Sequence, residues 1–144
     1  MGKTWVVVAA SSRARIFSLE GGEALKELED LTKPSARQHE TDLTSDLPGR
    51  SFDSAGAGRH AMEEPTSPKH REAIEFSREV AARLDQARTR NELERLAIVA
   101  APAFLGLLRQ HFTPELAKAV VLEIDKDLSR ADSTEIRDHL PKRI

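Results

Sequence analysis

The sequence predicts a single α/β domain in which helices pack on a mixed sheet of about five strands. Its 144 residues suit one hydrophobic core rather than two. Short β-branched or alternating apolar runs, typical of strands, occur near the start of the chain and again at 96–100 and 120–124. Longer stretches with helical spacing separate the later runs. Hairpin strands followed by helix, strand, helix and strand indicate a mixed sheet.

The first strands are expected to form a hairpin. Thr4 to Ala10 is a continuous β-branched run, which is typical of a central strand buried on both faces. After a turn at Ser11-Ser12, residues 14–19 alternate and predict a second, antiparallel strand. Gly21-Gly22 predicts the next turn, because glycine accepts positive φ. Leu25 to Leu31 alternates imperfectly and indicates a weaker third strand near an edge of the sheet.

The longest helix is predicted from Ser67-Pro68, which reads as N-cap and first helical position, to about Arg90. Its apolar stripe faces the sheet, while Arg, Glu and Asp fill the other side. The stripe comprises Ala73, Ile74, Val80, Ala81, Leu84 and Ala87. Leu96 to Ala100 follows as a short apolar run and predicts another buried strand.

The C-terminal part continues the alternation of helix and strand. Pro102 to His111 predicts a helix that turns Phe104, Leu105, Leu107 and Leu108 inward. Thr113-Pro114 begins a short turn or helix, and residues 120–124 form the last strand. Asp132 with Glu135 three residues later predicts a capping box for a final helix, which Pro141 ends.

The amino-acid composition argues against several classes of function. With 22 basic and 24 acidic side chains well mixed, no overall field draws the protein to nucleic acid or lipid, so such binding requires a local patch. The absence of cysteine suits a reducing compartment and excludes thiol chemistry. The apolar run Trp5 to Ala10 is too short for a signal peptide, and no stretch reaches the ~20 residues of a membrane span. We expect a cytoplasmic protein that needs no cofactor.

A long polar loop interrupts the domain between about Thr32 and Ser67. Proline and glycine are scattered there among Ser, Thr, Asp, Arg and His, with almost no aliphatic residues. Loops of this length without their own structure are uncommon in compact domains, and those that occur are usually functional or disordered. The loop is therefore the first place to look for a binding site.

Residues 46–60 are the richest part of this loop. Glycines expose backbone N–H groups, and basic side chains nearby suit an anion or a polynucleotide backbone. Phe52 is the one aromatic residue of the loop and could stack on a base or anchor the loop to the body. The predicted binding residues are Arg50, Ser51, Phe52, Asp53, Arg59 and His60. A solvated loop is the alternative, since six basic and six acidic residues balance between Lys33 and Arg71.

Other chemistry has weaker support in the sequence. The loop lacks the Gly-Lys-Ser/Thr of a Walker motif and the strand-turn-helix setting of a dinucleotide fingerprint. Asp125 and Asp127 could resemble a metal pair, but surface charge and capping explain them better. The five histidines show no zinc-ligand spacing, and no serine lies in a nucleophile elbow. We predict no metal site and no catalytic residue.

Several segments together resemble one known family. They are Trp5 to Ala9, Ser12 to Phe17, Gly49 to Ser54 with Gly58 to His60, Phe104 to Gly106, and Lys126 to Leu128. The chain resembles the bacterial host attachment proteins over nearly its whole length. That family is similar to the middle domain of eukaryotic and archaeal peptide-chain release factors, in which a Gly-Gly-Gln loop precedes a long helix.

The resemblance implies a functional loop before the long helix. The Gly-Gly-Gln triplet is missing, so peptidyl-tRNA hydrolysis does not carry over, and Ala10 stands where the family favours an acidic residue. We expect a non-enzymatic protein whose 46–60 loop binds RNA, the ribosome or a protein partner, and which affects attachment to host cells indirectly. One alternative is a hydrolase directed at peptidyl-tRNA or nucleic acid, which would use the same loop through His60 and Asp53, or a metal centred on Asp125. The other alternative is a surface adhesin.

Overall fold

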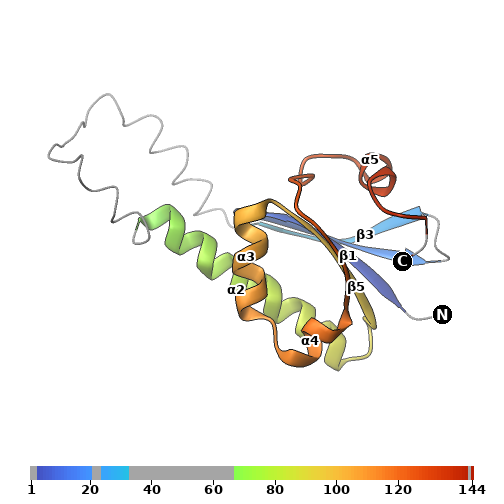
Figure 1. Cartoon of the computed structure of the whole chain (residues 1–144), viewed down its shortest axis with the longest axis horizontal. Helices are drawn as coiled ribbons and strands as arrows, with labels where there is room; N and C mark the ends of the chain where they lie inside the picture. Colours follow the sequence, from blue (N-terminus) through green and yellow to red (C-terminus); the bar gives the residue numbers. More distant parts are fainter. Residues whose placement is uncertain (1–2, 21–23, 33–66, 143) are drawn as a thin grey trace, which may run out of the picture.

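The computed structural model describes residues 3–20, 24–32, 67–142 and 144. They form a five-stranded mixed sheet with helices on it, in the strand order β3-β2-β1-β5-β6 (Figure 1). The strands are β1 (Thr4–Ala10), β2 (Arg13–Glu20), β3 (Ala24–Thr32), β5 (Arg95–Ala100) and β6 (Val120–Ile124). The helices are α2 (Pro68–Thr89), α3 (Pro102–His111), α4 (Pro114–Ala119) and α5 (Ser133–Asp138). The α/β fold class predicted from the sequence is confirmed.

Strand β1 lies at the centre of the sheet, as its β-branched run predicts. It pairs antiparallel with β2 and parallel with β5, and β6 adds a further parallel strand beyond β5. Val6, Val7 and Val8 are completely buried, although successive side chains point to opposite faces. Both faces of the sheet are therefore covered at this strand.

Helices α2, α3 and α4 cover one face of the sheet (Figure 1). The hydroxyl of Ser67 accepts a hydrogen bond from the backbone N–H of His70 at 3.1 Å, and Pro68 is the first helical residue, so the predicted start of α2 is confirmed. The apolar stripe of α2 also includes Phe76, which the sequence analysis did not select. Its ring lies 5.8 Å from that of Phe104, which joins α2 to α3.

The chain after β6 and helix α5 cover the other face. Ile136 is completely buried there, together with Phe17 from β2. Asp132 caps α5 by accepting a hydrogen bond from the backbone N–H of Glu135 at 2.8 Å, as predicted. Among the described residues, this layer contains less helix than the layer opposite, because α5 has only six residues.

A bulge explains why the alternation of β3 is imperfect. The register pairs Ile16 with Glu29 and Phe17 with Glu27, so Leu28 has no partner on β2. The extra residue shifts the alternation by one, which turns Glu29 toward the face covered by α2 and Glu27 toward the face covered by α5. Leu28 itself is 40 % exposed on this edge strand. A bulge and charged side chains on an edge strand hinder pairing with another chain.

Strand β3 ends at Thr32, and Ser67 caps α2. The long loop predicted between these two residues stays a prediction. Residues 33–66, and the turn predicted at Gly21-Gly22, lie outside the described residues. Among the helices in the described part of the chain, none combines the length and the apolar character that crossing a membrane requires.

Candidate functional site

The binding residues predicted from the sequence lie outside the part of the chain that the structure describes. They are Arg50, Ser51, Phe52, Asp53, Arg59 and His60, and they remain a prediction. The two residues that bound their segment are described, however. Thr32 pairs with Arg13 at the end of the β2–β3 ladder, so the chain leaves the sheet beside the beginning of β2.

This point lies at the carboxyl end of the sheet, by which we mean the end where the parallel strands β1, β5 and β6 finish. Because β2 runs antiparallel to β1, it begins there, and β3 ends there. Helix α3 also starts there, directly after β5 (Figure 1). In open α/β sheets, ligands bind in the crevice outside the carboxyl ends of the strands. The described residues at this end are therefore the first to inspect for a site.

A polar hollow of about 280 Å³ opens at the carboxyl end. Its walls are the β1–β2 turn and the segment that follows β6. The lining residues are Ala10, Ser11, Ser12, Arg13, Asp127, Ser129 and Arg130. Drug-sized ligands usually occupy pockets of ~300–1,000 Å³, so the polar hollow suits a single small group rather than a whole cofactor.

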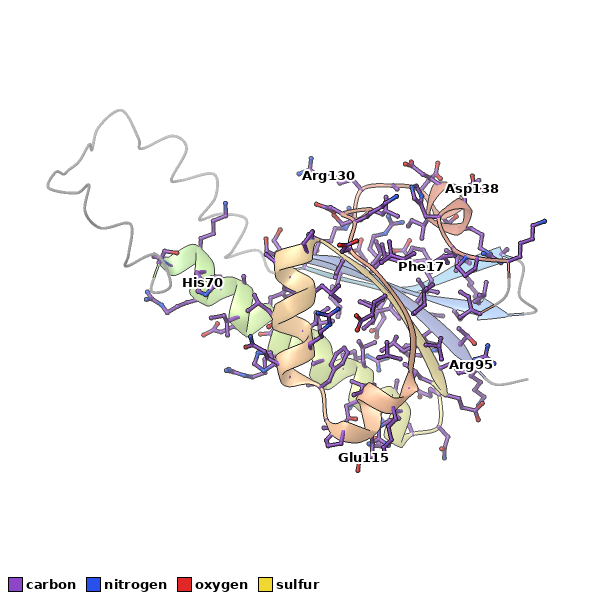
Figure 2. The ribbon with its side chains drawn as sticks, in the orientation of Figure 1. Phe17, His70, Arg95, Glu115, Arg130 and Asp138 are labelled. Carbon is purple, nitrogen blue, oxygen red and sulfur yellow. The ribbon has the colours of Figure 1, made fainter. Side chains whose placement is uncertain are left out.

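The two arginines of the polar hollow differ in their contacts. Arg13 forms a bidentate ion pair with Asp30 of β3, with Nε and Nη2 at 3.0 and 2.7 Å from the two carboxylate oxygens. This pair raises the pKa of Arg13, chiefly through the hydrogen bond to Asp30. Arg130 is exposed on the segment between β6 and α5 (Figure 2) and has no ion-pair partner among the described residues. Its guanidinium is therefore available to a ligand.

Arg15 fixes the wall that carries Ser129 and Arg130. Its guanidinium donates to both carboxylate oxygens of Glu27 at 3.1 Å and to the backbone carbonyls of Ser129 and Ala131. It also lies 5.1 Å from the centre of the Phe17 ring, and it is only 9 % exposed. One side chain thus holds β2, β3 and the segment after β6 together. In the sequence, Arg15 stands out only as part of a family motif, and nothing beside it indicates this role.

The structure also locates the carboxylates that the sequence analysis considered as a metal pair. Asp127 accepts hydrogen bonds from the hydroxyl and the backbone N–H of Ser129, at 2.7 and 3.1 Å. It therefore stabilises a turn, which supports the structural interpretation. In the described ranges, no group of three or more His, Cys, Asp or Glu residues is arranged to hold a metal ion.

Comparison with known families identifies the family of this chain. The model of a family described as "Protein required for attachment to host cells" matches residues 5–140. The chain belongs to this family. The host attachment family was the one that the sequence segments resemble, so that resemblance is confirmed. A comparison with curated proteins found no match.

The solved structures that are similar to the host attachment chain include the following two. The archaeal translation termination factor aRF1 matches with a TM-score of 0.52 and 11 % identity, over 97 % of this chain and 35 % of that one. The chain thus spans about a third of the length of aRF1, and the likeness shows the fold alone. A Ppx/GppA phosphatase of Aquifex aeolicus matches with a TM-score of 0.40 and 14 % identity, over 86 % of this chain and 35 % of the phosphatase. At this TM-score, the similarity to the phosphatase does not establish a shared fold.

Proposed function

We propose that this host attachment protein is a non-enzymatic, cytoplasmic RNA-binding protein that contacts RNA, including ribosomal RNA, through residues 46–60. Attachment to host cells is then affected indirectly, through gene expression or translation. The observation that carries the proposal is the order of elements. The chain leaves the sheet at Thr32, at its carboxyl end, and returns at the first turn of the longest helix. The fold of the domain is similar to about a third of a protein known as a translation termination factor.

The residue types of the 46–60 segment suit contacts with an RNA backbone. Arg50 and Arg59 supply fixed positive charge for phosphate groups, and the glycines between them allow the backbone N–H groups to approach an anion closely. Phe52 offers a ring on which a base can stack, a contact worth about 1–3 kcal/mol per base. Binding of this kind reads the backbone more than the sequence of the RNA.

The non-enzymatic part of the proposal rests on the sequence. The triplet Gly-Gly-Gln does not occur, and the nearest alternative would pair His60 with Asp53 as a general base and its partner. Incubation of the protein with ester and nucleic-acid substrates tests this alternative. Turnover that disappears in His60→Ala would replace the binding protein by a hydrolase.

The direct test is the salt dependence of RNA binding. Fluorescence anisotropy of a labelled single-stranded RNA is measured with wild type and with Arg50→Ala/Arg59→Ala, between about 50 and 200 mM salt. We expect the double variant to bind at least tenfold more weakly, and its log-log salt slope to fall by about two, one for each lost phosphate contact. Arg78→Ala/Arg90→Ala is the matched control, because it removes two exposed charges from α2 and its C-cap. Absent or salt-independent binding by wild type contradicts the proposal.

Two cellular measurements test the partner and the compartment. A tagged pulldown should recover RNA or ribosomes with wild type and not with the Arg50/Arg59 variant. Recovery of one protein without RNA would identify a protein partner instead. Fractionation should place the protein in the cytosol, whereas its presence at the cell surface would support an adhesin.

A further inference from the structure

We infer that the polar hollow at the carboxyl end of the sheet is a second contact for the RNA, holding one backbone phosphate between Arg130 and the β1–β2 turn. This inference rests on the proposed function, but it concerns residues outside the 46–60 segment. It assigns a ligand to side chains on the body of the domain that no structural role explains.

The donors of the polar hollow have no other use in the described part of the chain. Arg130 forms no ion pair there, and the hydroxyls of Ser11 and Ser12 have no hydrogen-bond partner among the described residues. All three groups line the same hollow from two different segments. Hydroxyl and guanidinium donors that converge on one small space are the groups that recognise a phosphate.

Arg13 adds a guanidinium that is already oriented. Its Nε and Nη2 are engaged by Asp30, which leaves Nη1 free to donate into the polar hollow. A guanidinium held on one edge by a carboxylate loses little further side-chain entropy when a ligand binds its other edge. Asp30 neutralises most of the charge of Arg13, so Arg130 supplies most of the attraction.

One lining residue opposes an anion. The carboxylate of Asp127 faces the same space, although its Oδ1 is occupied by two hydrogen bonds from Ser129. Because Asp30 neutralises most of the charge of Arg13, Arg130 provides the main positive charge of the lining and Asp127 opposes it. This weak electrostatic balance suits a singly charged phosphodiester held mainly by hydrogen bonds rather than a highly charged polyphosphate.

The position of the polar hollow agrees with RNA that also contacts the 46–60 segment. Arg13, which lines the hollow, pairs with Thr32, the last described residue before that segment. A strand of RNA bound there would cross the carboxyl end of the sheet, where open α/β sheets bind their ligands.

The test compares two single substitutions that remove the same charge. Arg130→Gln lies in the polar hollow, and Arg90→Gln is an exposed matched control at the far end of α2. In the RNA anisotropy assay, we expect Arg130→Gln to weaken binding about five- to tenfold and to lower the salt slope by about one. Arg90→Gln should leave both unchanged. Equal behaviour of the two variants overturns the inference.

The substitution Asp127→Asn should change RNA affinity in the opposite direction. Asparagine keeps an oxygen that can accept from Ser129 but removes the negative charge, so affinity for RNA should rise about two- to fivefold. A loss of affinity for RNA would contradict a phosphate in the hollow.

The failure of this inference can be told from the failure of the proposed function. If wild type binds RNA and Arg50→Ala/Arg59→Ala weakens it while Arg130→Gln does not, only the polar hollow is excluded. If wild type binds no RNA, an NMR titration with the dinucleotide UpU still decides whether the hollow recognises a phosphodiester. Shifts confined to the amides of 11–13 and 127–130 support it, and shifts elsewhere or none contradict it.

Discussion

The two ends of the sheet differ in what their polar groups contact. At the amino end, where β1 and β5 begin, groups from separate elements bond to each other. The backbone N–H of Lys3 donates to the Glu94 carboxylate at 3.0 Å, and its ammonium donates to the carbonyl of Asn91 at 3.0 Å. At the carboxyl end, Arg130 and the serines of the β1–β2 turn have no such partners among the described residues.

This difference indicates that the amino end of the sheet serves stability and that the rim of the carboxyl end serves ligand binding. Figure 2 shows Arg95 and Glu115 far from Arg130, at the end where the elements close on one another. That end is not perfectly satisfied, since Arg95 Nε and His111 Nε2 are buried without a partner in the described residues. The hydrogen bonds of Lys3 to Glu94 and Asn91 nevertheless join separate elements at this end, so substitutions there should affect folding. Substitutions at the rim of the carboxyl end should affect ligand binding.

The largest loss of stability is expected from a substitution of Arg15, which holds the wall of the polar hollow in place. Arg15→Met keeps an apolar stem against Phe17 but removes the bonds to Glu27 and to the carbonyls of Ser129 and Ala131. Because these buried groups lose a charged donor, we expect the free energy of unfolding to fall by about 3 kcal/mol. Chemical denaturation measures this loss, and RNA affinity should fall with it, because the wall of the polar hollow loosens.

Arg83→Met is the matched control for Arg15. Arg83 also forms a bidentate pair with a β3 glutamate, Glu29, and lies 5.5 Å from the ring of Trp5. It sits on the opposite face of the sheet and is more exposed, so we expect a loss of about 1 kcal/mol and unchanged RNA affinity. Equal losses of stability and affinity in the two variants would contradict a specific role of Arg15 in the wall.

A smaller effect, dependent on pH, is expected from Asp85 on the far half of α2. The hydrogen bond from Arg88 holds the pKa of Asp85 below its usual value, and the hydroxyl of Thr113 donates to it at 3.0 Å. We expect Asp85→Asn to lower stability by about 1 kcal/mol at neutral pH. A lowered folded pKa stabilises above the unfolded pKa, so the difference from wild type should shrink as pH falls below about 4. Denaturation curves across pH check this, and a difference that grows in acid would contradict it.

The smallest effect is expected from Glu94 at the amino end. Glu94→Ala removes an exposed hydrogen bond to the backbone of Lys3 and should lower stability by about 0.5 kcal/mol. Its RNA affinity should equal that of wild type, although the substitution makes the net charge more positive. A gain in affinity as large as that expected for Asp127→Asn would show that RNA responds to overall charge and not to one end of the sheet.

Local signals in the sequence predicted most of the fold. The β-branched run of β1, the Ser67-Pro68 helix start and the Asp132 cap each depend on a few neighbouring residues, so spacing alone identifies them. The edge position of β3 followed from its weak alternation. The family resemblance was also carried by local segments.

Contacts between distant segments could not be predicted in the same way. Arg15 meets Ala131 across 116 positions, and an arginine inside an alternating strand gives no sign of such a partner. The bulge at Leu28 depends on the register with β2, which sequence spacing does not reveal. The polar hollow joins 10–13 to 127–130, and only the fold brings these segments together.

The central claim is that RNA binds at the carboxyl end of the sheet. Hydrogen exchange of the full chain, with and without a single-stranded RNA, tests it most directly because both ends are observed in one experiment. The account predicts slower exchange in peptides covering 11–13, 127–131 and 46–60, and unchanged exchange around Lys3 and 89–95. Protection at the amino end, or no protection at saturating RNA, would contradict it.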